Sequence, residues 1–420
     1  MNPPVNRLSF AKDRTWIGLL AAIALVYHAY FIVKAWRQPV LLYGDAYYYD
    51  HSAHVLNTLH LYAYWSWGPA AQVTPGYPLF LALVYRLAAL FTPSHETAMH
   101  LAQACQHLLA VAASLLVYVI ARFRLPRYAS FIAAFLWTVY PPVIYANDQL
   151  LTENLYIPFL LAFVWSFLVL VRDRTWQSFV ASGLLLAVTT LIRPSVAPLL
   201  AAPACLFLQR ETRRSWTSTL RKYALYIATF VVAMVPWWVR NLVAMHQWIT
   251  TDLDAANPLL FGSDPTFYKD TNISNGLTYA QQKALAIHRI EEGFRTHPLA
   301  YLKWYTLDKL GWLFGTPWYN TVLPQHAGLL TRWTFAYAHL HLVWVIVGAI
   351  GLAIGFGMRY VRWLSWLTVF LIVVQLPFIP INRYAYPTMP FLFVGVGTVV
   401  YLVAAWARLR RATPRKTAAP

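Results

Sequence analysis

Long apolar segments recur along this chain of 420 residues, and they constrain its fold more than any other feature. The first covers about residues 15–34, and similar segments continue to about residue 407. A helix needs about 20 mainly apolar residues to cross the hydrocarbon core of a bilayer. Only 11% of the residues are charged, whereas a soluble domain usually has about a quarter. We therefore predict an all-α polytopic membrane protein.

About ten segments are suitable as membrane spans. They are residues 15–34, 99–121, 128–146, 154–171, 178–192, 195–208, 223–241, 335–357, 364–381 and 386–407. Two further apolar stretches, 74–92 and 299–315, are expected to lie as juxtamembrane helices on the outer surface. If residues 74–92 crossed the membrane, the basic cluster at 122–127 would fall on the outer side.

Basic residues set the expected orientation. The clusters Arg7/Lys12/Arg14, Arg122/Arg124/Arg127, Arg172/Arg174, Arg210/Arg213/Arg214/Arg221/Lys222, Arg359/Arg362 and Arg408/Arg410/Arg411/Arg415/Lys416 hold 20 of the 33 lysines and arginines. Because basic loops stay in the cytoplasm, both termini are predicted to be cytoplasmic. The net charge of +18 is thus assigned to topology, and no nucleic acid partner is expected. A bacterial-type inner (plasma) membrane is the predicted location.

The chain is predicted to form one integrated membrane domain, 1–420, with no separate soluble domain. Within it we expect a first outer loop at 35–98, a large outer loop at 242–334 and a C-terminal three-helix part at 335–420. Cys105 and Cys205 lie inside apolar runs, so they are interpreted as packing residues and not as a disulfide or a metal site.

Two carboxylates are the candidate catalytic groups. Asp45 follows the first span by about ten residues, and Glu153 lies between the third and fourth spans. Both should therefore face the outer compartment near the membrane plane, where a carboxylate can act as a general base on a hydroxyl or amine. The alternative is that each merely caps a helix, a role that Thr152 or Asn154 could equally fill beside Glu153.

Three arginines stand at the predicted outer ends of spans, against the general charge pattern. They are Arg193, Arg240 and Arg383. Together they would form an anion site, since guanidinium is suited to phosphate. The alternative is that each arginine reaches the lipid headgroups separately. Because three occur on one side together with two carboxylates, we predict that they bind the phosphate of a lipid carrier.

Aromatic and polar neighbours of these groups are candidate substrate contacts. The residues predicted to touch substrate are Tyr48, Tyr49, Asp148 and Tyr384. An aromatic face stacks well on a sugar ring, although any single tyrosine here could equally belong to an interfacial aromatic belt.

Asp50, His51 and His54 place metal-ligand types close together, yet this spacing is common by chance. These three residues are weak metal candidates. No cofactor is expected to be required, and a divalent metal stays an open alternative.

Several short motifs carry a resemblance to a known family. They are Gly44-Asp45-x3-Tyr49-x3-Ala53, Thr74-Pro75-Gly76-Tyr77-Pro78-Leu79, Leu151-Thr152-Glu153, Leu191-Ile192-Arg193-Pro194, Pro236-Trp237-Trp238-Val239-Arg240-Asn241 and Arg383-Tyr384-x2-Pro387-x2-Pro390. In order and sidedness they resemble the GT-C glycosyltransferases of the family 39-like type, which comprises protein O-mannosyltransferases and lipid A aminoarabinose transferases. Ala46 stands where that family usually has a second acidic residue.

The resemblance implies a GT-C fold and a polyprenyl-phosphate sugar donor. It also implies transfer to a lipid, glycan or protein acceptor at the outer membrane face, with Asp45 in the role of the catalytic carboxylate. We predict an inverting single displacement by a hexosyl- or pentosyltransferase. Two alternatives stay open: a lipid-linked sugar flippase or transporter without covalent chemistry, and an O-antigen ligase or polymerase-like protein.

Overall fold

The computed structural model describes residues 10–209, 215–269, 272–319 and 329–412, and all its regular elements there are helices. The basic residues at 7, 210–214, 415 and 416 that entered the prediction of orientation lie outside the described residues. Arg221, Lys222, Arg408, Arg410 and Arg411 lie within them.

The first half of the chain contains α1 to α9. Their bounds are α1 Phe10–Ala35, α2 Asp45–Leu59, α3 Gly76–Ala88, α4 His95–Arg122, α5 Arg127–Thr138, α6 Pro141–Asn147, α7 Glu153–Asp173, α8 Trp176–Ile192, the 3₁₀ helix η1 Pro194–Leu208, and α9 Trp216–Met245. Pro198 and Pro203 lie inside η1. Because proline has no N–H to donate, these residues favour the irregular helix over a regular α-helix.

The second half contains the outer segment and the last spans. Its elements are α10 Ala256–Gly262, α11 Tyr279–Thr296, α12 Pro298–Lys303, the π-helical turn η3 Trp304–Asp308, α13 Lys309–Phe314, α14 Leu329–His339, α15 His341–Gly355, α16 Val361–Gln375, α17 Asn382–Ala385, η4 Tyr386–Thr388 and α18 Met389–Ala412.

Five of the described helices are long and apolar enough to cross a membrane, and α5 with α6 would make a sixth span bent by 46°. Five shorter apolar helices of 10–17 residues add to them, namely α3, α8, most of η1, α15 and α16. The protein is thus a multi-pass membrane protein, and ten spans are consistent with this set.

Besides the bent segment expected at 128–146, two of the predicted spans differ in detail from the structure. The segment expected at 335–357 is broken at Leu340, where α14 ends and α15 begins. The segment expected at 364–381 stops as a helix at Gln375, because Pro377 and Pro380 follow closely and cannot continue it. The second break is important, because the chain that follows it carries Arg383 to the charged cluster described below.

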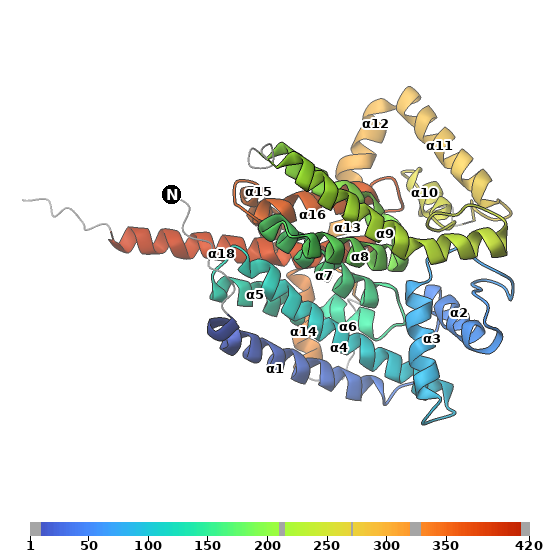
Figure 1. Cartoon of the computed structure of the whole chain (residues 1–420), viewed down its shortest axis with the longest axis horizontal. Helices are drawn as coiled ribbons and strands as arrows, with labels where there is room; N and C mark the ends of the chain where they lie inside the picture. The colour runs from blue at the N-terminus through green and yellow to red at the C-terminus, as the bar shows by residue number, and fades with distance from the viewer. Residues whose placement is uncertain (1–9, 210–214, 270–271, 320–328, 413–420) are drawn as a thin grey trace, which may run out of the picture.

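The long helices lie side by side and run across the view in Figure 1. Neighbours along the chain pack in succession, in the order α1, α4, α7, α8 and α9. The helix α18 packs against α5 and most extensively against α15. Gly351 and Gly395 allow that close contact, because a Cβ on Gly351 would collide with the carbonyl oxygen of Gly395.

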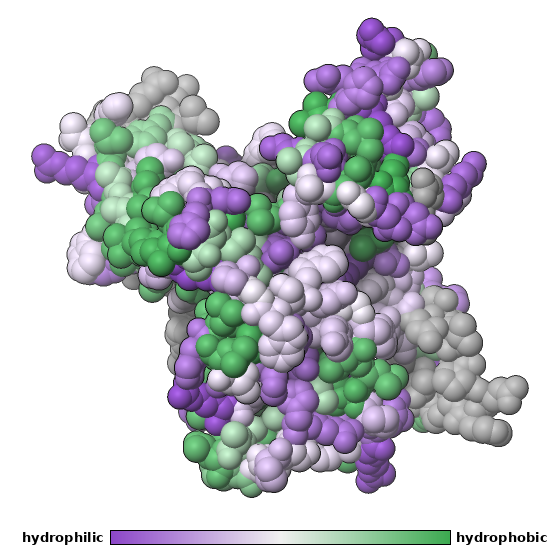
Figure 2. All heavy atoms as spheres, turned by 90° about the vertical axis from the view of Figure 1, so that its right-hand side faces the viewer, coloured by the Kyte–Doolittle hydropathy of each residue, from purple (hydrophilic) through white to green (hydrophobic). Residues whose placement is uncertain are grey.

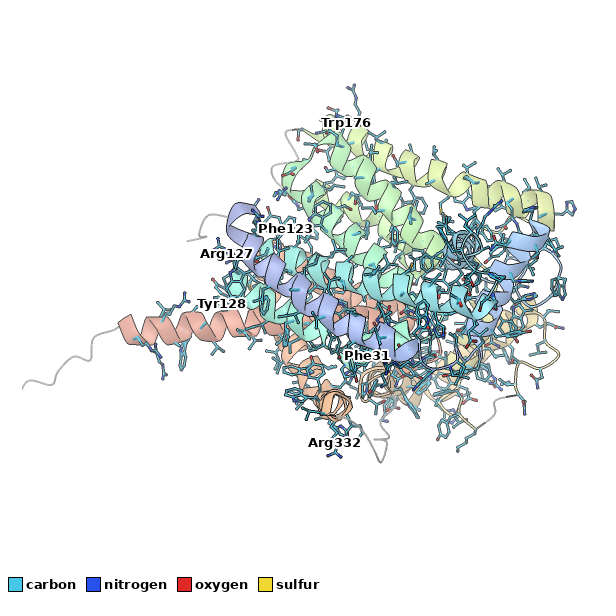
Figure 3. The ribbon with its side chains drawn as sticks, turned by 90° about the horizontal axis from the view of Figure 1, so that it is seen from below. Phe31, Phe123, Arg127, Tyr128, Trp176 and Arg332 are labelled. Carbon is cyan, nitrogen blue, oxygen red and sulfur yellow. The ribbon has the colours of Figure 1, made fainter. Side chains whose placement is uncertain are left out.

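The basic clusters gather at one end of the bundle. There Asp13 of α1 is fully buried and accepts bonds from Arg122 Nε at 2.9 Å and from Tyr118 at 2.8 Å, with Arg127 Nε at 3.3 Å. Figure 3 places Arg127 and Phe123 together at this end and Phe31 toward the other end of α1. Arg172 also lies over the Phe123 ring, at 5.3 Å. Arg122, Arg127 and Arg172, from two of the predicted basic clusters, thus lie together at this end.

Replacing Asp13 with asparagine should lower the free energy of unfolding by about 3–5 kcal/mol, because two arginines lose their buried counter-charge. The matched control is Asp173→Asn, which removes the partially exposed pair with Arg172 and should cost at most about 1 kcal/mol. The shift of the thermal unfolding midpoint in detergent measures both. Equal shifts for the two variants would contradict this account.

The opposite end carries α2, α3, α10 and α11 (Figure 1). Residues 74–92 and 299–315, predicted as surface helices, correspond there to α3 and to the run from α12 to α13. The main chain ties the two outer loops together, since Leu253 N–H donates to Ala71 O at 3.0 Å and Asp254 N–H donates to Gln72 O at 3.1 Å. These bonds bring a segment from the large loop over the first loop.

Candidate active site

Four charged side chains from distant parts of the sequence meet at this end of the bundle. Arg383 Nη1 donates to Asp45 Oδ2 at 2.6 Å, and its Nε and Nη2 donate to the two oxygens of Glu153 at 2.5 and 2.9 Å. Arg193 Nη1 also donates to Glu153 Oε1, at 2.7 Å. Of the two predicted carboxylates and three predicted arginines, both carboxylates and two arginines are thus in direct contact.

Local backbone structure delivers each of these groups. Asp45 and Glu153 are the first residues of α2 and α7, where the positive end of the helix dipole favours a carboxylate. Gly44 precedes Asp45 with a φ of 58°, a left-handed conformation that glycine adopts without strain.

Arg193 lies between α8 and η1 in an extended conformation, with φ −150° and ψ 116°. Pro194 enforces this, because the residue before a proline is pushed away from helical dihedrals. The side chain of Arg193 therefore leaves the helix and reaches Glu153. Its guanidinium also lies near the faces of Tyr384 and Tyr156, at 5.4 and 5.8 Å from their centroids.

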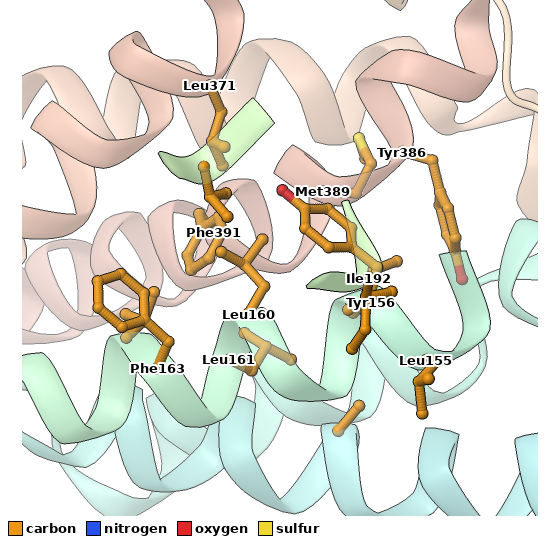
Figure 4. Close-up of a cluster of buried hydrophobic side chains, with 14 of the residues drawn as sticks. Leu155, Tyr156, Leu160, Leu161, Phe163, Ile192, Leu371, Tyr386, Met389 and Phe391 are labelled. Atoms are coloured by element: carbon orange, nitrogen blue, oxygen red, sulfur yellow. The ribbon is translucent and has the colours of Figure 1, made fainter. Parts of the chain in front are cut away.

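Glu153 is fully buried and serves as the shared counter-charge of both arginines. Thr152 adds a hydroxyl bond to Glu153 Oε2 at 3.3 Å. The carboxylate of Glu153 is therefore committed to holding the two guanidinium groups in place. A packed apolar core lies directly beneath, in which Leu155 and Tyr156 of α7 lie near Ile192, Tyr386 and Met389 (Figure 4).

A cavity of about 350 Å³ opens at this cluster. Its charged lining consists of Asp45, Arg193, Asp252, Asp254 and Arg383. Asp45 is the accessible carboxylate of the ion-paired group, with 44% of its side chain exposed. Figure 2 looks onto this end of the molecule and shows that the face is hollowed between raised lobes.

Asp252 and Asp254 are two lining residues that the sequence analysis did not single out. They follow α9, and Trp237 Nε1 donates to Thr251 O at 2.9 Å just before them. The only sequence signal was an Asp-x-Asp pair at the start of a predicted outer loop, and such a pair is usually a solvated turn. The main-chain bonds to Ala71 and Gln72, described above, are what bring it over the pocket.

Both of these carboxyl groups are less acidic than usual. Burial raises the pKa of Asp252 to about 6, against an opposing effect of Arg193. Burial raises the pKa of Asp254 to about 7, with further contributions from the negative charges of Asp45 and Asp252. Near neutral pH this pair therefore titrates, which suits it to exchanging protons.

Arg240 does not join the cluster, and the expected convergence of three arginines is corrected to two. Its Nη2 and Nη1 donate to the main-chain oxygens of Tyr62 at 2.8 Å and Ala70 at 2.5 Å. Its guanidinium also lies 5.2 Å from the Tyr62 ring centroid. Arg240 thus fixes the first outer loop against α9. The sequence predicts only the side of the membrane on which Arg240 lies, and that side is the same for this position and for one in the pocket.

Of the four predicted substrate contacts, two line the cavity and two lie outside its lining. Tyr49 and Tyr384 line the cavity. Tyr48 is outside its lining and stacks on Trp65 with 5.0 Å between centroids. Asp148 is also outside the lining, where its Oδ1 lies 3.4 Å from His107 Nε2.

The weak metal candidates do not assemble into a ligand set. Asp50 accepts a bond from Tyr85 at 2.7 Å and lies 3.0 Å from His95 Nε2. His51 is 3.5 Å from the main-chain oxygen of Ser66. Within the described ranges, no three histidine, cysteine or acidic residues are grouped so that they could hold a metal ion.

A second cavity, of about 600 Å³, is lined mostly by apolar side chains of α7, η1 and α16. The first cavity is lined by Pro194, Ser195 and Pro198 of η1, and the second by Leu199, Ala202 and Cys205. The two cavities therefore follow one another along the same helix, away from the charged cluster.

Comparison with known proteins gives matches in sequence and in structure. Residues 72–239 match the family model described as dolichyl-phosphate-mannose-protein mannosyltransferase. That range contains Glu153 and Arg193, whereas Asp45 and Arg383 lie outside it. No curated protein matches the chain significantly.

Two solved structures of the Archaeoglobus fulgidus oligosaccharyltransferase are similar to the chain. The structure of AglB in complex with an inhibitory peptide and a dolichol-phosphate has 15% identity and a TM-score of 0.56, covering 98% of this chain and 53% of that one. The apo form has 15% identity and a TM-score of 0.59, covering 97% and 52%. The chain thus spans about half the length of these proteins. The helical architecture and the matched family model together assign to this chain the GT-C fold of membrane glycosyltransferases.

Proposed function

We propose that the protein transfers a sugar from a polyprenyl-phosphate donor to an acceptor at the outer face of the membrane. The observation that carries this proposal is the pocket in which Arg193 and Arg383 converge beside the accessible carboxylate of Asp45. The pocket lies at the end of the bundle opposite the basic clusters. The GT-C fold agrees with this class of reaction.

The two arginines are proposed to bind the donor's phosphate. A guanidinium has five N–H groups, so each arginine keeps donors for an anion after its bonds to carboxylates. Phosphate would enter a position already lined by fixed positive charge. Such preorganised charge lowers the barrier most where negative charge develops, which here is the leaving phosphate oxygen.

Asp45 is proposed to act as the base. Arg383 donates a bond to Asp45, and a phosphate bound at Arg383 would compete for the same guanidinium and release the carboxylate. The acceptor oxygen then bonds to the anomeric carbon while the bond from that carbon to the phosphate oxygen breaks. The electron pair leaves on the phosphate, and the acceptor's proton passes to the carboxylate. A single displacement of this kind inverts the anomeric centre.

The apolar cavity along η1 and α16 supports a lipid-borne donor. Its lining includes Phe167, Leu199, Leu367 and Phe370, a surface that a hydrocarbon chain would cover with favourable burial. A prenyl chain lying there would bring its phosphate end toward the arginines.

Reconstitution tests the proposal. The purified protein in liposomes, supplied with radiolabelled polyprenyl-phosphate sugars and candidate acceptors, should move label from carrier to acceptor. Arg383→Ala should abolish that transfer and the donor-induced rise in melting temperature, whereas Arg86→Ala, at an exposed arginine of α3, should keep both. Movement of intact donor across the bilayer without transfer would instead indicate a transporter.

A further inference from the structure

The charged lining of the pocket is unbalanced. Arg193 and Arg383 are already bound to Glu153 and Asp45. Asp252 and Asp254 also line the cavity, and neither has a lysine or arginine within ion-pair distance in the part of the chain that the structure describes. The pocket thus contains a second pair of carboxylates that the binding of phosphate does not use.

The position of this pair is fixed by its main chain and not by its charges. Leu253, between the two acids, packs against the hydrophobic core. The bonds of Leu253 N–H to Ala71 and of Asp254 N–H to Gln72 hold the segment on the first outer loop. The carboxyl group of Asp254 therefore remains free to meet a ligand, while its backbone is anchored.

Asp254 interacts electrostatically most strongly with Asp45. The other titratable groups that act on it or respond to it are Asp252 of the same segment, Tyr64 of the first outer loop and Tyr279 of α11. Arg193 acts on Asp252 and is not among the groups that shift Asp254. The charge of Asp45 therefore acts on Asp254 within the same cavity.

We propose that Asp254 is a second catalytic carboxylate, which holds the acceptor's nucleophilic group and, together with Asp45, takes up its proton. This inference rests on the proposed transferase function. As the acceptor oxygen bonds to the anomeric carbon and the carbon–phosphate oxygen bond breaks, one proton leaves the acceptor. The Asp45–Asp254 pair receives it and then releases it to water.

The division of work has a physical reason. Asp45 lies in contact with Arg383, the group that the leaving phosphate would occupy. In an inverting displacement the acceptor hydroxyl approaches the face of the sugar opposite the leaving group, so the group that holds this hydroxyl should lie away from the phosphate. A carboxylate on a different segment, free of arginine and less acidic than usual because of burial, is better suited to bind the incoming hydroxyl.

The test uses Asp254→Asn in the full-length protein, with Asp308→Asn as the control. Asp308 belongs to the same outer loop but pairs with Lys303 on the surface, away from the pocket. Asp254→Asn should lower the maximal transfer rate at least about tenfold and remove a rise in rate that wild type shows as pH increases through about 7. Donor affinity should be unchanged or tighter, because one negative charge is lost near the phosphate. Asp254→Glu should restore part of the rate and the pH dependence.

Two results would overturn the inference. One is a normal rate with an unchanged pH profile in Asp254→Asn while wild type is active. The other is a loss of donor affinity in Asp254→Asn that accounts for the whole loss of rate, since Asp254 would then recognise a cationic group of the donor. Wild type that transfers no sugar from any donor would overturn the proposed function itself, so the two failures are distinguishable.

Discussion

Replacing Asp45 with asparagine should reduce sugar transfer by about 10²–10⁴-fold, the usual contribution of a positioned general base. Asparagine keeps the shape of the side chain and removes only its charge and its ability to take a proton. Arg383 keeps both bonds to Glu153, so the phosphate-binding arginines should stay in place. Transfer of label from a polyprenyl-phosphate sugar measures the rate.

Donor binding provides the internal control for this variant. The donor should raise the melting temperature of Asp45→Asn at least as much as that of wild type, because the donor no longer competes with Asp45 for Arg383. Asp264→Asn, at a partially exposed residue of the large outer loop, is the matched substitution and should transfer normally. Turnover close to wild type in Asp45→Asn would remove the assignment of this carboxylate as the base.

Replacing Glu153 with glutamine should strongly lower the stability of the protein. The substitution leaves Arg193 and Arg383 side by side without their shared buried counter-charge. Removing one partner from a buried ion pair typically costs about 3–5 kcal/mol. Thermal unfolding in detergent should therefore show a large fall in the melting temperature, together with loss of transfer.

Addition of a polyprenyl phosphate separates the role of Glu153 from a general packing effect. The lipid phosphate supplies the missing negative charge, so it should stabilise Glu153→Gln more than it stabilises wild type. Glu96→Gln, at an exposed position in the first turn of α4, should cost no more than about 1 kcal/mol and should respond to lipid as wild type does. An equal response of Glu153→Gln and wild type to the lipid would show that the two arginines do not bind its phosphate.

Simple chemistry made part of the site predictable. Asp45 and Glu153 were found because ionisable residues are rare in an apolar chain and stand out at the predicted ends of spans. Arg193 was found for the same reason, and Pro194 explains why its side chain leaves the helix. Arg383 lies 230 residues from Glu153. Their predicted location on the same side of the membrane suggests that they could meet, but their distance along the sequence gives no such indication.

The rest of the site depended on how the outer loops fold over the bundle. Arg240 and Arg193 are predicted on the same side of the membrane. Arg240 has a structural role because it bonds to the main-chain carbonyls of Tyr62 and Ala70, and these contacts are not visible in the sequence. Asp254 lies in a polar loop where acidic residues are ordinary. It becomes a site residue because its main chain bonds to Gln72, in a loop from which the helices α3 to α9 separate it along the sequence.

Three features were predictable from the sequence: the membrane environment, the all-helical class, and the end of the bundle where the candidate catalytic charges lie. These follow from the cost of leaving backbone or charged groups in hydrocarbon, which acts on each segment independently. The ion pairs themselves are seen only in the tertiary structure, because each one joins segments that are far apart in the chain. Three findings depend on such long-range contacts. Arg383 pairs with Glu153, Arg240 bonds to the first outer loop and stays outside the pocket, and Asp254 is held at the pocket by its main chain.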